Sequence, residues 1–516
     1  MPTPTSERTS FSWSDRILLL SAAGILFLTL FPFHFISHER VSGLFPFFHG
    51  QMREGKSSGA LDAFLNVLLF APFGFGLAEK LREKGKLRAA TLASVWVTGA
   101  LFSYTIEVLQ IYVPSRDSGW GDVITNSSGS VVGYLGYELY GKWVLGILGE
   151  IENVLRSFLR PRTAALLLLA YFGIWFAASY QLQTTTRLRG WDPNPILVLG
   201  NDTWNRPWQA WKGRVLSLAI WDRAIPDQAA IALTSKATDA AAVDSPIAAY
   251  GPSPRLLQQD SMKFFPALAW RPAVGPQVQA ESLALQGQAW LVSEEPAPQL
   301  VARLEKSNRF SVQITCIPGT SGEPDGRIVS IGHPAAPGDL TVRQKGPSLV
   351  FWFHTPLSAR HAQLAWTVPG VFTTAGQARD ILYTYDGSSL SLFLDGKKEE
   401  RPFRLGAGPA LARSVRRIKP GELEGYSDIY YALIFFPAGI VLGLAARKTG
   451  GPGESSGTAD WLLLGALLIV APWLLEILLV RAGSRPFLAG EADLSLAFFV
   501  AGALWINAGL SPMKKA

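Results

Sequence analysis

The sequence predicts a multidomain membrane protein: a bundle of eight transmembrane helices, with one all-β sandwich inserted between two groups of them. Of the 516 residues, 48% are hydrophobic and only 17% are charged, which is too apolar for a soluble chain of this length. Long apolar runs recur toward both ends of the chain. Between residues 182 and 425 they give way to short alternating runs separated by turn signals, the pattern of β-strands.

Eight apolar runs approach the length of about 20 residues that crosses a bilayer. The first is not followed by a small-residue cleavage site, so we expect it to be retained as a membrane anchor. The run at 122–140 is the weakest of the eight. The runs lie near residues 16–36, 62–80, 89–112, 122–140, 162–181, 427–446, 460–480 and 493–510.

The distribution of Lys and Arg predicts the orientation, because short cytoplasmic loops are enriched in both. With the N-terminus inside, the short inner segments hold fifteen Lys and Arg and the short outer loops hold six. Both termini are then cytoplasmic and residues 182–425 lie outside the plasma membrane, unless the weak fourth run does not span. The net charge of +7 therefore reflects membrane topology and does not indicate nucleic-acid binding.

An internal repeat runs through the predicted spans. Pro72 and Gly74 recur 365 residues later as Pro437 and Gly439. At a constant offset of 369, the residues Glu107, Ser115, Arg116, Gly121, Asp122 and Gly133 recur as Glu476, Ser484, Arg485, Gly490, Glu491 and Gly502. Two four-helix units in parallel orientation are therefore expected. The predicted domains are a four-helix unit at 1–160, a fifth helix at 161–181, the sandwich at 182–425 and three helices at 426–516.

Polar residues gather at the predicted outer end of the first unit. Charge within a membrane span is costly, about 2.5–3.5 kcal/mol at a helix centre, so such residues usually face a partner or a cavity. The second unit replaces three of them, with Tyr431, Leu479 and Ser495, and is a degenerate copy. The predicted ligand-binding set is Asp62, Asn66, Glu107, Gln110, Arg116, Asp122 and Asn126.

Three roles are open for this set. Arg116 suits a phosphate or another anionic headgroup, which a guanidinium binds through two hydrogen bonds. Glu107 and Asp122 are candidate general bases, if they are partly desolvated. Alternatively, the polar groups pair with one another and lock the helices together without any ligand.

The first 140 residues resemble the VanZ-like family. Its pattern of D-x3-N, P-x-G, S-x3-E-x2-Q, Arg, D-x3-N and spaced glycines is met by Asp62, Asn66, Pro72, Gly74, Ser103, Glu107, Gln110, Arg116, Asp122, Asn126, Gly129 and Gly133. The resemblance implies a bacterial membrane protein with several spans. The family is named for an accessory of glycopeptide-antibiotic resistance, and the resemblance implies no molecular activity.

Two segments of the outer domain resemble the concanavalin A-like lectin/glucanase sandwich of the LamG type. Residues 381–398 contain two strand-like runs that each end in Asp-Gly, which suits a tight hairpin. Residues 198–226 resemble the closing strands of that fold, yet precede the hairpin. The resemblance implies a jelly roll. About 245 residues suit one sandwich better than two, which favours a single circularly permuted domain in which residues 195–225 complete sheets begun at 280–400. Two partial sandwiches are the alternative.

Candidate residues of the outer domain each have a structural alternative. Trp204, Trp208 and Trp211 would form a platform for stacking on a sugar, or else core packing. Loop aspartates would bind calcium, or else make turns. The three aspartates are Asp202, Asp325 and Asp339.

Few catalytic or covalent features accompany these candidates. The domain lacks the paired carboxylates of a glucanase of this type, E-x-D-x-x-E. Cys316, the only cysteine, excludes an intramolecular disulfide and is expected to be a small buried hydrophobic residue. Calcium aside, the sequence indicates no metal or other cofactor.

These features favour a binding and accessory protein of the bacterial cell envelope. The sandwich would hold a glycan or envelope polymer, and the helices would hold a polar or lipid-linked ligand at the outer face. A membrane enzyme acting on a lipid-linked precursor and a protein-interaction scaffold remain alternatives. A transporter is disfavoured, because the polar residues lie at one membrane face and not near the midplane.

Overall fold

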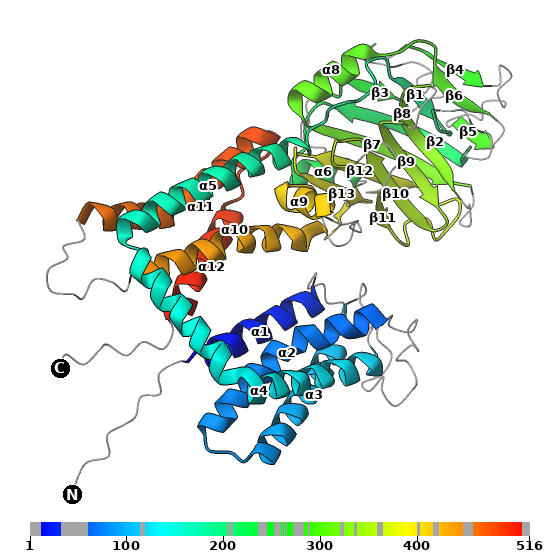
Figure 1. Cartoon of the computed structure of the whole chain (residues 1–516). Coiled ribbons are helices and arrows are strands. Elements are labelled where there is room, and N and C mark those ends of the chain that lie inside the picture. Colours follow the sequence, from blue (N-terminus) through cyan, green and yellow to red (C-terminus); the bar gives the residue numbers. More distant parts are fainter. Residues whose placement is uncertain are drawn as a thin grey trace, which may run out of the picture. The chain divides into compact units, whose positions relative to one another are not determined.

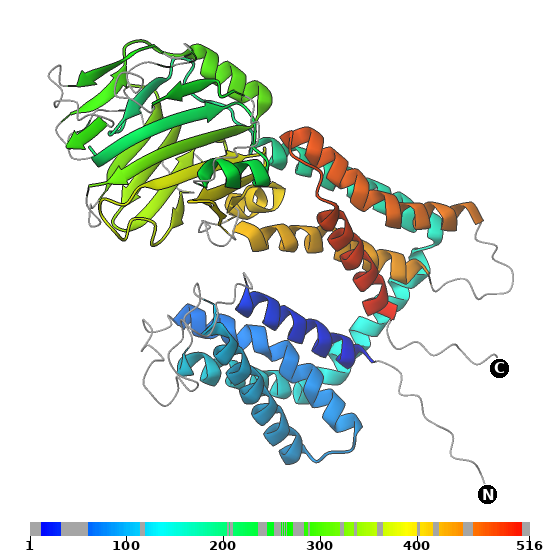
Figure 2. The same cartoon turned by 180° about the vertical axis from the view of Figure 1, so that it is seen from behind.

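The computed structural model divides into two compact parts, which differ from the two predicted repeat units and are drawn in Figures 1 and 2. The first comprises Met1–Ile174, Tyr431–Pro472 and Gly490–Ala516, and the second comprises Trp175–Tyr430 and Trp473–Ala489. The structure describes residues 12–31, 60–113, 119–203, 206, 210–235, 245–251, 260, 262, 264, 266–271, 283–286, 289–319, 325–334, 338–358, 365–399, 403–415, 423–446 and 458–507.

The first four helices pack side by side (Figure 1). They are α1 (Trp13–Leu30), α2 (Ala60–Glu83), α3 (Arg88–Gln110) and α4 (Trp120–Phe158). Their apolar core contains Ile25 and Phe70 with no exposed surface, and the rings of Phe73 and Phe102 stack at 5.1 Å. Large apolar side chains also point outward, and Leu101 is 61% exposed. A surface of this kind suits contact with lipid.

Four more long helices follow: α5 (Pro161–Thr184), α10 (Leu423–Ala445), α11 (Thr458–Gly483) and α12 (Ala489–Asn507). The Tyr171 hydroxyl on α5 donates to the carbonyls of Leu433 and Ile434 on α10, at 3.1 and 3.0 Å. Phe172 on α5 packs against Phe435 and Phe499. The boundary between the two compact parts passes through α5, α10 and α11, so these helices belong to both parts.

Seven helices in the described ranges are long and apolar enough to cross a membrane, namely α1, α2, α3, α5, α10, α11 and α12. The predicted fourth span lies in α4, which is not among them. This helix continues to Phe158, well beyond the predicted end of the span at residue 140. Arg156 pairs with Glu152 one turn earlier at 2.6 Å, a contact that favours continued helix. The crossing by α4 thus stays a prediction.

Glycines allow the second and fourth helices of each predicted unit to touch backbone to backbone. A Cβ atom on Gly74 would lie 2.0 Å from the Ser130 carbonyl oxygen, and one on Gly133 would lie 2.0 Å from that of Ala71. The corresponding Cβ distances in the C-terminal helices are 2.0 Å for Gly439 to Phe499 O and 2.1 Å for Gly502 to Phe436 O. Every partner recurs at the offset of its own helix, so the α2–α4 contact is repeated between α10 and α12.

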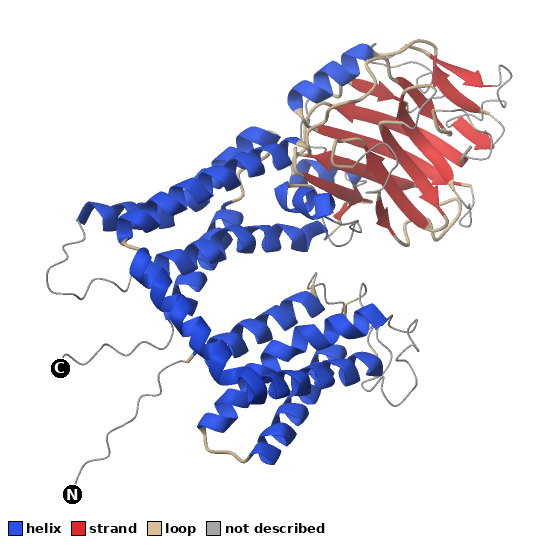
Figure 3. Ribbon diagram, viewed as in Figure 1, coloured by secondary structure: helices blue, strands red, loops and turns tan. Residues whose placement is uncertain are grey.

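The β-domain consists of two antiparallel sheets (Figure 3). The first has the order β11 (Trp366–Val368), β10 (Ser348–Phe353), β9 (Leu340–Lys345), β8 (Gly326–Gly332), β1 (Ile196–Leu199), β6 (Trp290–Ser293), β4 (Leu268–Arg271). The second has the order β14 (Lys397–Lys398), β13 (Ser389–Leu394), β12 (Arg379–Tyr385), β7 (Phe310–Pro318), β2 (Lys212–Trp221), β3 (Ala248–Tyr250), with β15 (Phe403–Arg404) on β13 and β5 (Leu283–Gln286) on β2. Short helices α6 (Asp227–Thr234), α8 (Pro298–Ser307) and α9 (Ala407–Val415) complete it.

The two sequence segments that resembled parts of a sandwich form one domain. Strand β1 lies between β8 and β6 in the first sheet, and β2 pairs with β7 in the second. Both sheets contribute to a single core, for example through Leu197 from the first and Ile314 from the second. Residues 195–225 therefore complete both sheets as predicted, and the alternative of two partial sandwiches is wrong. The jelly-roll connectivity and the permutation stay predictions.

The predicted hairpin at 381–398 is also present. Strand β12 pairs with β13 from Ile381 opposite Leu394 to Tyr385 opposite Leu390. The second Asp-Gly pair joins β13 to β14 with positive φ at both Asp395 (50°) and Gly396 (81°). Two successive positive φ angles define the type I′ turn that matches the twist of a hairpin, and Asp-Gly adopts them at low cost.

Candidate functional site

The described members of the predicted ligand-binding set meet at one end of the first four helices. Asp62 lies in the first turn of α2, Gln110 ends α3, and Asp122 lies in the first turn of α4. The end of α1 belongs to the same group, because the Gln110 side-chain amide donates to the Thr29 carbonyl at 2.9 Å. Antiparallel packing of successive helices brings these termini together, as the sequence predicted.

Asn66 and Asp122 form the most direct link between two predicted site residues. The Asn66 side-chain amide donates to Asp122 Oδ1 at 2.8 Å, and to the Thr125 hydroxyl at 3.3 Å. Thr125 lies three residues after Asp122 on α4, and sequence reasoning did not include it. Both Asn66 and Asp122 are half-buried, so the pair is reachable from outside the bundle.

Two amide side chains in this region each have a buried oxygen without a hydrogen-bond partner in the described ranges. Asn126 donates to the Ser103 hydroxyl at 2.9 Å, which joins α4 to α3. The Asn126 Oδ1 and Gln110 Oε1 atoms are buried and accept no hydrogen bond from any residue within the described ranges. Buried polar atoms are nearly always paired, so an unpaired one suggests a group that is not part of the protein.

Three carboxylates lie near one another in the same region. Asp122 is close enough to interact electrostatically with both Glu107 and Asp62. Across the ranges that the structure covers, none of the three makes an ion pair with Lys or Arg. Arg116, the predicted cation of the site, lies outside the described residues.

Glu107 has a clear structural partner. Its side chain is buried, with the residue 2% exposed, and Oε2 accepts a hydrogen bond from the Gly119 backbone N–H at 2.9 Å. Gly119 is the N-cap residue of α4. A carboxylate at a helix N-terminus satisfies an unpaired N–H group and interacts favourably with the helix dipole. Glu107 therefore ties the end of α3 to the start of α4.

The second predicted unit makes the same contact. Glu476 Oε1 accepts a hydrogen bond from Leu488 N at 2.7 Å, just before α12 begins. Both partners lie 369 residues after Glu107 and Gly119. Glu476 also pairs with Arg485 at 2.6 Å, and the two side chains are 1% and 3% exposed. Because this copy lacks most of the polar set, the contact itself is structural.

The Asn66–Asp122 link has only an altered counterpart. At the matching positions, the Tyr431 hydroxyl donates to Glu491 Oε2. The buried amides have none, since Leu479 and Ser495 replace Gln110 and Asn126. The first unit thus differs from the second in its amides and in Asp122, and shares the Glu107 contact with it.

The tryptophan platform predicted on the β-domain is wrong for Trp211. This residue has no exposed surface, and its indole Nε1 donates to Gln344 Oε1 at 2.8 Å inside the sandwich. A ring enclosed in the core is not available for stacking on a sugar. Trp204 and Trp208 lie outside the described residues.

The predicted calcium aspartates are engaged separately. Asp202 pairs with Arg206 at 2.5 Å, and Asp325 pairs with Arg327 and Arg343 at 2.8 and 3.1 Å. Asp339 accepts a hydrogen bond from Asp192 N at 2.8 Å. Within the described part of the chain no three His, Cys, Asp or Glu residues group in a way that would hold a metal ion.

In the comparison with known proteins, a family model matches the first part of the chain. The family model described as VanZ/LLP1 matches residues 3–141, which include the whole predicted binding set. No curated protein and no solved structure matches the chain. The predicted resemblance of the first 140 residues is thereby confirmed, and that of the β-domain to lectins remains a prediction.

Proposed function

We propose that this is a bacterial envelope protein whose first four helices hold the polar head of a lipid-linked ligand at the outer membrane face. The observation that carries the proposal is the pair of buried acceptors on Asn126 and Gln110, at the same helix ends as Asp122. Together these atoms offer acceptors to hydroxyl or amine donors of a headgroup. Arg116, six residues after the end of α3, would supply the cation for a phosphate.

Glu107 takes a positioning role in this proposal. Its hydrogen bond to Gly119 holds the start of α4, and with it Asp122, against α3. The same contact in the second unit supports this role. The amides and Asp122 then carry the binding.

Binding can be tested with the full-length protein in nanodiscs that contain undecaprenyl phosphate. Native mass spectrometry would count retained lipid in the wild type, in Asp122→Asn and in Asn126→Leu. We expect both variants to lose retained lipid at least tenfold. Glu491→Gln changes the matching position of the second unit and should retain it fully. Equal retention by the folded Asp122→Asn and Asn126→Leu proteins would refute the proposal.

A membrane enzyme is the second candidate, because a carboxylate pair also suits general acid–base chemistry. The same preparation separates the two functions. Chemical conversion of an undecaprenyl-linked substrate that Glu107→Gln abolishes, while retention of the lipid is unchanged, would favour catalysis.

For the sandwich we propose binding of an envelope glycan, on the strength of its likeness to LamG-type segments. Glycopeptide antibiotics act on the same envelope, and the matched family is associated with resistance to them. Teicoplanin susceptibility of cells with and without this protein tests the physiological link: an unchanged minimal inhibitory concentration would argue against it.

A further inference from the structure

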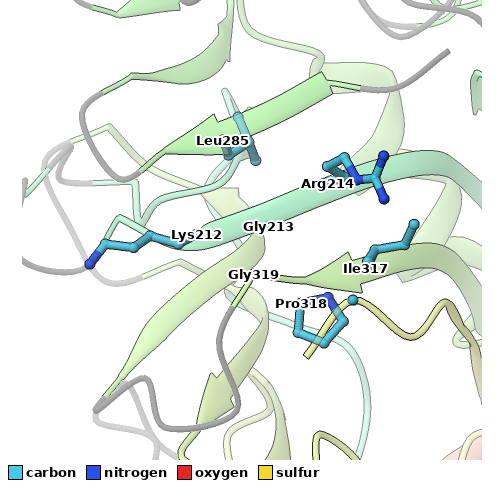
Figure 4. Close-up of a pocket in the computed structure, with 8 residues that line it drawn as sticks. Lys212, Gly213, Arg214, Leu285, Ile317, Pro318 and Gly319 are labelled. Atoms are coloured by element: carbon cyan, nitrogen blue, oxygen red, sulfur yellow. The ribbon is translucent and has the colours of Figure 1, made fainter. Parts of the chain in front are cut away.

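A pocket of about 380 Å³ opens on the second sheet of the sandwich, where β2, β5 and β7 run together (Figure 4). Its size lies at the low end of the range of about 300–1,000 Å³ typical of ligand pockets. Sequence reasoning placed no site here. The residues that line it are Lys212, Gly213, Arg214, Leu285, Ile317, Pro318, Gly319 and Gly376.

Glycines shape the middle of the pocket. Gly376 has φ of +76° and donates its N–H to the Pro318 carbonyl at 2.9 Å, which brings its loop against the end of β7. Gly319 donates to the Lys212 carbonyl at 3.0 Å. A Cβ atom on Gly319 would lie only 3.1 Å from that oxygen. The backbone is therefore accessible along a strip that larger residues would fill.

The described residues that line the pocket carry charge of one sign. Among them, Lys212 and Arg214 are the ionisable residues, and both are exposed. They lie two residues apart on β2, so they belong to the same face of the sheet. In Figure 4 their side chains extend toward opposite sides, with Gly213 between them.

Among the residues that the structure describes, the Arg214 side chain makes no ion pair and no hydrogen bond. Several other arginines of the sandwich pair with a carboxylate, as Arg327 and Arg379 do. A free guanidinium beside apolar Ile317 and Pro318 suits a ligand that presents both an anionic group and an apolar face.

We infer that this pocket binds a saccharide unit that carries a carboxylate or a phosphate. Arg214 would bind the anionic group through two hydrogen bonds, Lys212 would add a second positive charge, and the sugar face would lie on the glycine strip between them. The inference rests on the proposed glycan binding by the sandwich and deepens it, since it specifies an anionic glycan.

The test uses the full-length protein in nanodiscs of neutral phosphatidylcholine, with tetragalacturonate as the carboxylate probe. Its methyl ester has the same rings without charge, and poly(glycerol phosphate) supplies the phosphate arm. We expect the wild type to bind at least one anionic probe at least tenfold more tightly than the ester. Binding should weaken as salt is added, because the site is exposed.

Variants link this binding to the pocket. Arg214→Gln and Lys212→Gln should each raise the Kd at least tenfold, with an unchanged unfolding midpoint. Lys345→Gln removes an exposed strand lysine from the other sheet and should leave the Kd unchanged.

The outcomes separate the two proposals. If the ester binds as tightly as the acid and Arg214→Gln has no effect, the anionic site is refuted while glycan binding stands. If no saccharide probe binds, both are refuted. Capture of the protein by phosphatidylglycerol vesicles that is lost in Arg214→Gln, with no saccharide bound, would assign the pocket to lipid instead.

Discussion

At the scale of single residues, the second repeat unit contains a buried ion pair between Glu476 and Arg485. Glu476 and Arg485 are almost fully enclosed, at 1% and 4% exposure, and Glu476 also accepts the Leu488 N–H. Removing one partner of such a pair leaves an uncompensated buried charge, which costs about 3–5 kcal/mol. The pair therefore stabilises the α11–α12 connection only while both charges are present.

Arg485→Met is expected to lower the stability of the protein by about 3–5 kcal/mol, because Glu476 would be left buried without its cation. The thermal unfolding midpoint of the purified protein in detergent measures this loss of stability. Arg481→Met removes an exposed arginine of the same segment and should leave the midpoint within about a degree, given the small effect of surface changes. Equal midpoints for the two variants would contradict the role of the pair.

Two enclosed tyrosines make the sandwich sensitive to alkali. Burial raises the pKa of Tyr383 and Tyr385 well above the ordinary value of 10.0. Burial also raises the pKa of the Cys316 thiol to about 12. Because these folded-state pKa values exceed the unfolded ones, the neutral tyrosines stabilise the fold below about pH 10 and the neutral thiol does so below about pH 9. Each contribution is lost as the pH rises further.

We expect the free energy of unfolding of the sandwich to fall above pH 10, by up to about 1.4 kcal/mol per pH unit for each tyrosine. Denaturant unfolding followed by tryptophan fluorescence at pH 8 to 11 measures the slope. Tyr383→Phe should reduce it, since a phenylalanine cannot ionise. A slope unchanged by this substitution would show that other groups cause the alkaline loss.

At the scale of elements, glycine sets the distance between paired helices. The contacts of Gly74 and Gly133 across α2 and α4 recur for Gly439 and Gly502 across α10 and α12. Small residues of this kind let helix backbones approach within a membrane, where no hydrophobic force drives helices together. The recurrence supports two related units more strongly than similar apolar sequence does.

Gly133→Ala is expected to destabilise the bundle by about 1–3 kcal/mol, because the new methyl group meets the Ala71 carbonyl. Gly136, one turn later on α4, has open space at its Cβ position. Gly136→Ala should therefore be neutral or slightly stabilising, as alanine favours a helix interior. Thermal midpoints of the two purified variants compare them, and a larger loss for Gly136→Ala would contradict the close contact at Gly133.

At the scale of the whole molecule, the sandwich joins strands that are far apart in the sequence. Ile220 on β2 pairs with Val312 on β7, which lies next to β12 in the same sheet. Ile220 and Ile381 belong to one buried cluster, each with no exposed surface. The domain should therefore unfold as a unit.

Ile220→Ala and Ile381→Ala are each expected to lower the same unfolding transition, by about 2–5 kcal/mol. Calorimetry of the full-length protein tests this. Two separate transitions, each sensitive to only one substitution, would mean that the two segments fold independently.

The membrane orientation gives a second prediction at this scale. Lys345 is the exposed last residue of β9, whereas the native thiol of Cys316 is fully buried. Lys345→Cys should react with a membrane-impermeant maleimide in intact cells, if the sandwich is extracytoplasmic. Labelling only after the membrane is broken would place the sandwich on the cytoplasmic side.

Features that depend on neighbouring residues could be predicted from the sequence alone. Apolar length predicted seven of the helices, and the Asp395-Gly396 pair predicted a turn that needs two positive φ angles. The polar spacing of Asp62, Asn66, Asp122 and Asn126 placed them on shared helix faces, since residues four apart lie together on any helix. These properties follow from local backbone geometry.

The contacts of each side chain, in contrast, became visible only in the folded structure. Trp211 is a core residue because Gln344, far along the chain, accepts its indole N–H. Glu107 is a structural contact of α4 because antiparallel packing brings Gly119 to it, and the Lys212–Arg214 pocket exists because β2 lies between β5 and β7. Such contacts join residues that are far apart in the sequence, so they depend on long-range packing. The spacing of residues along the chain does not predict them.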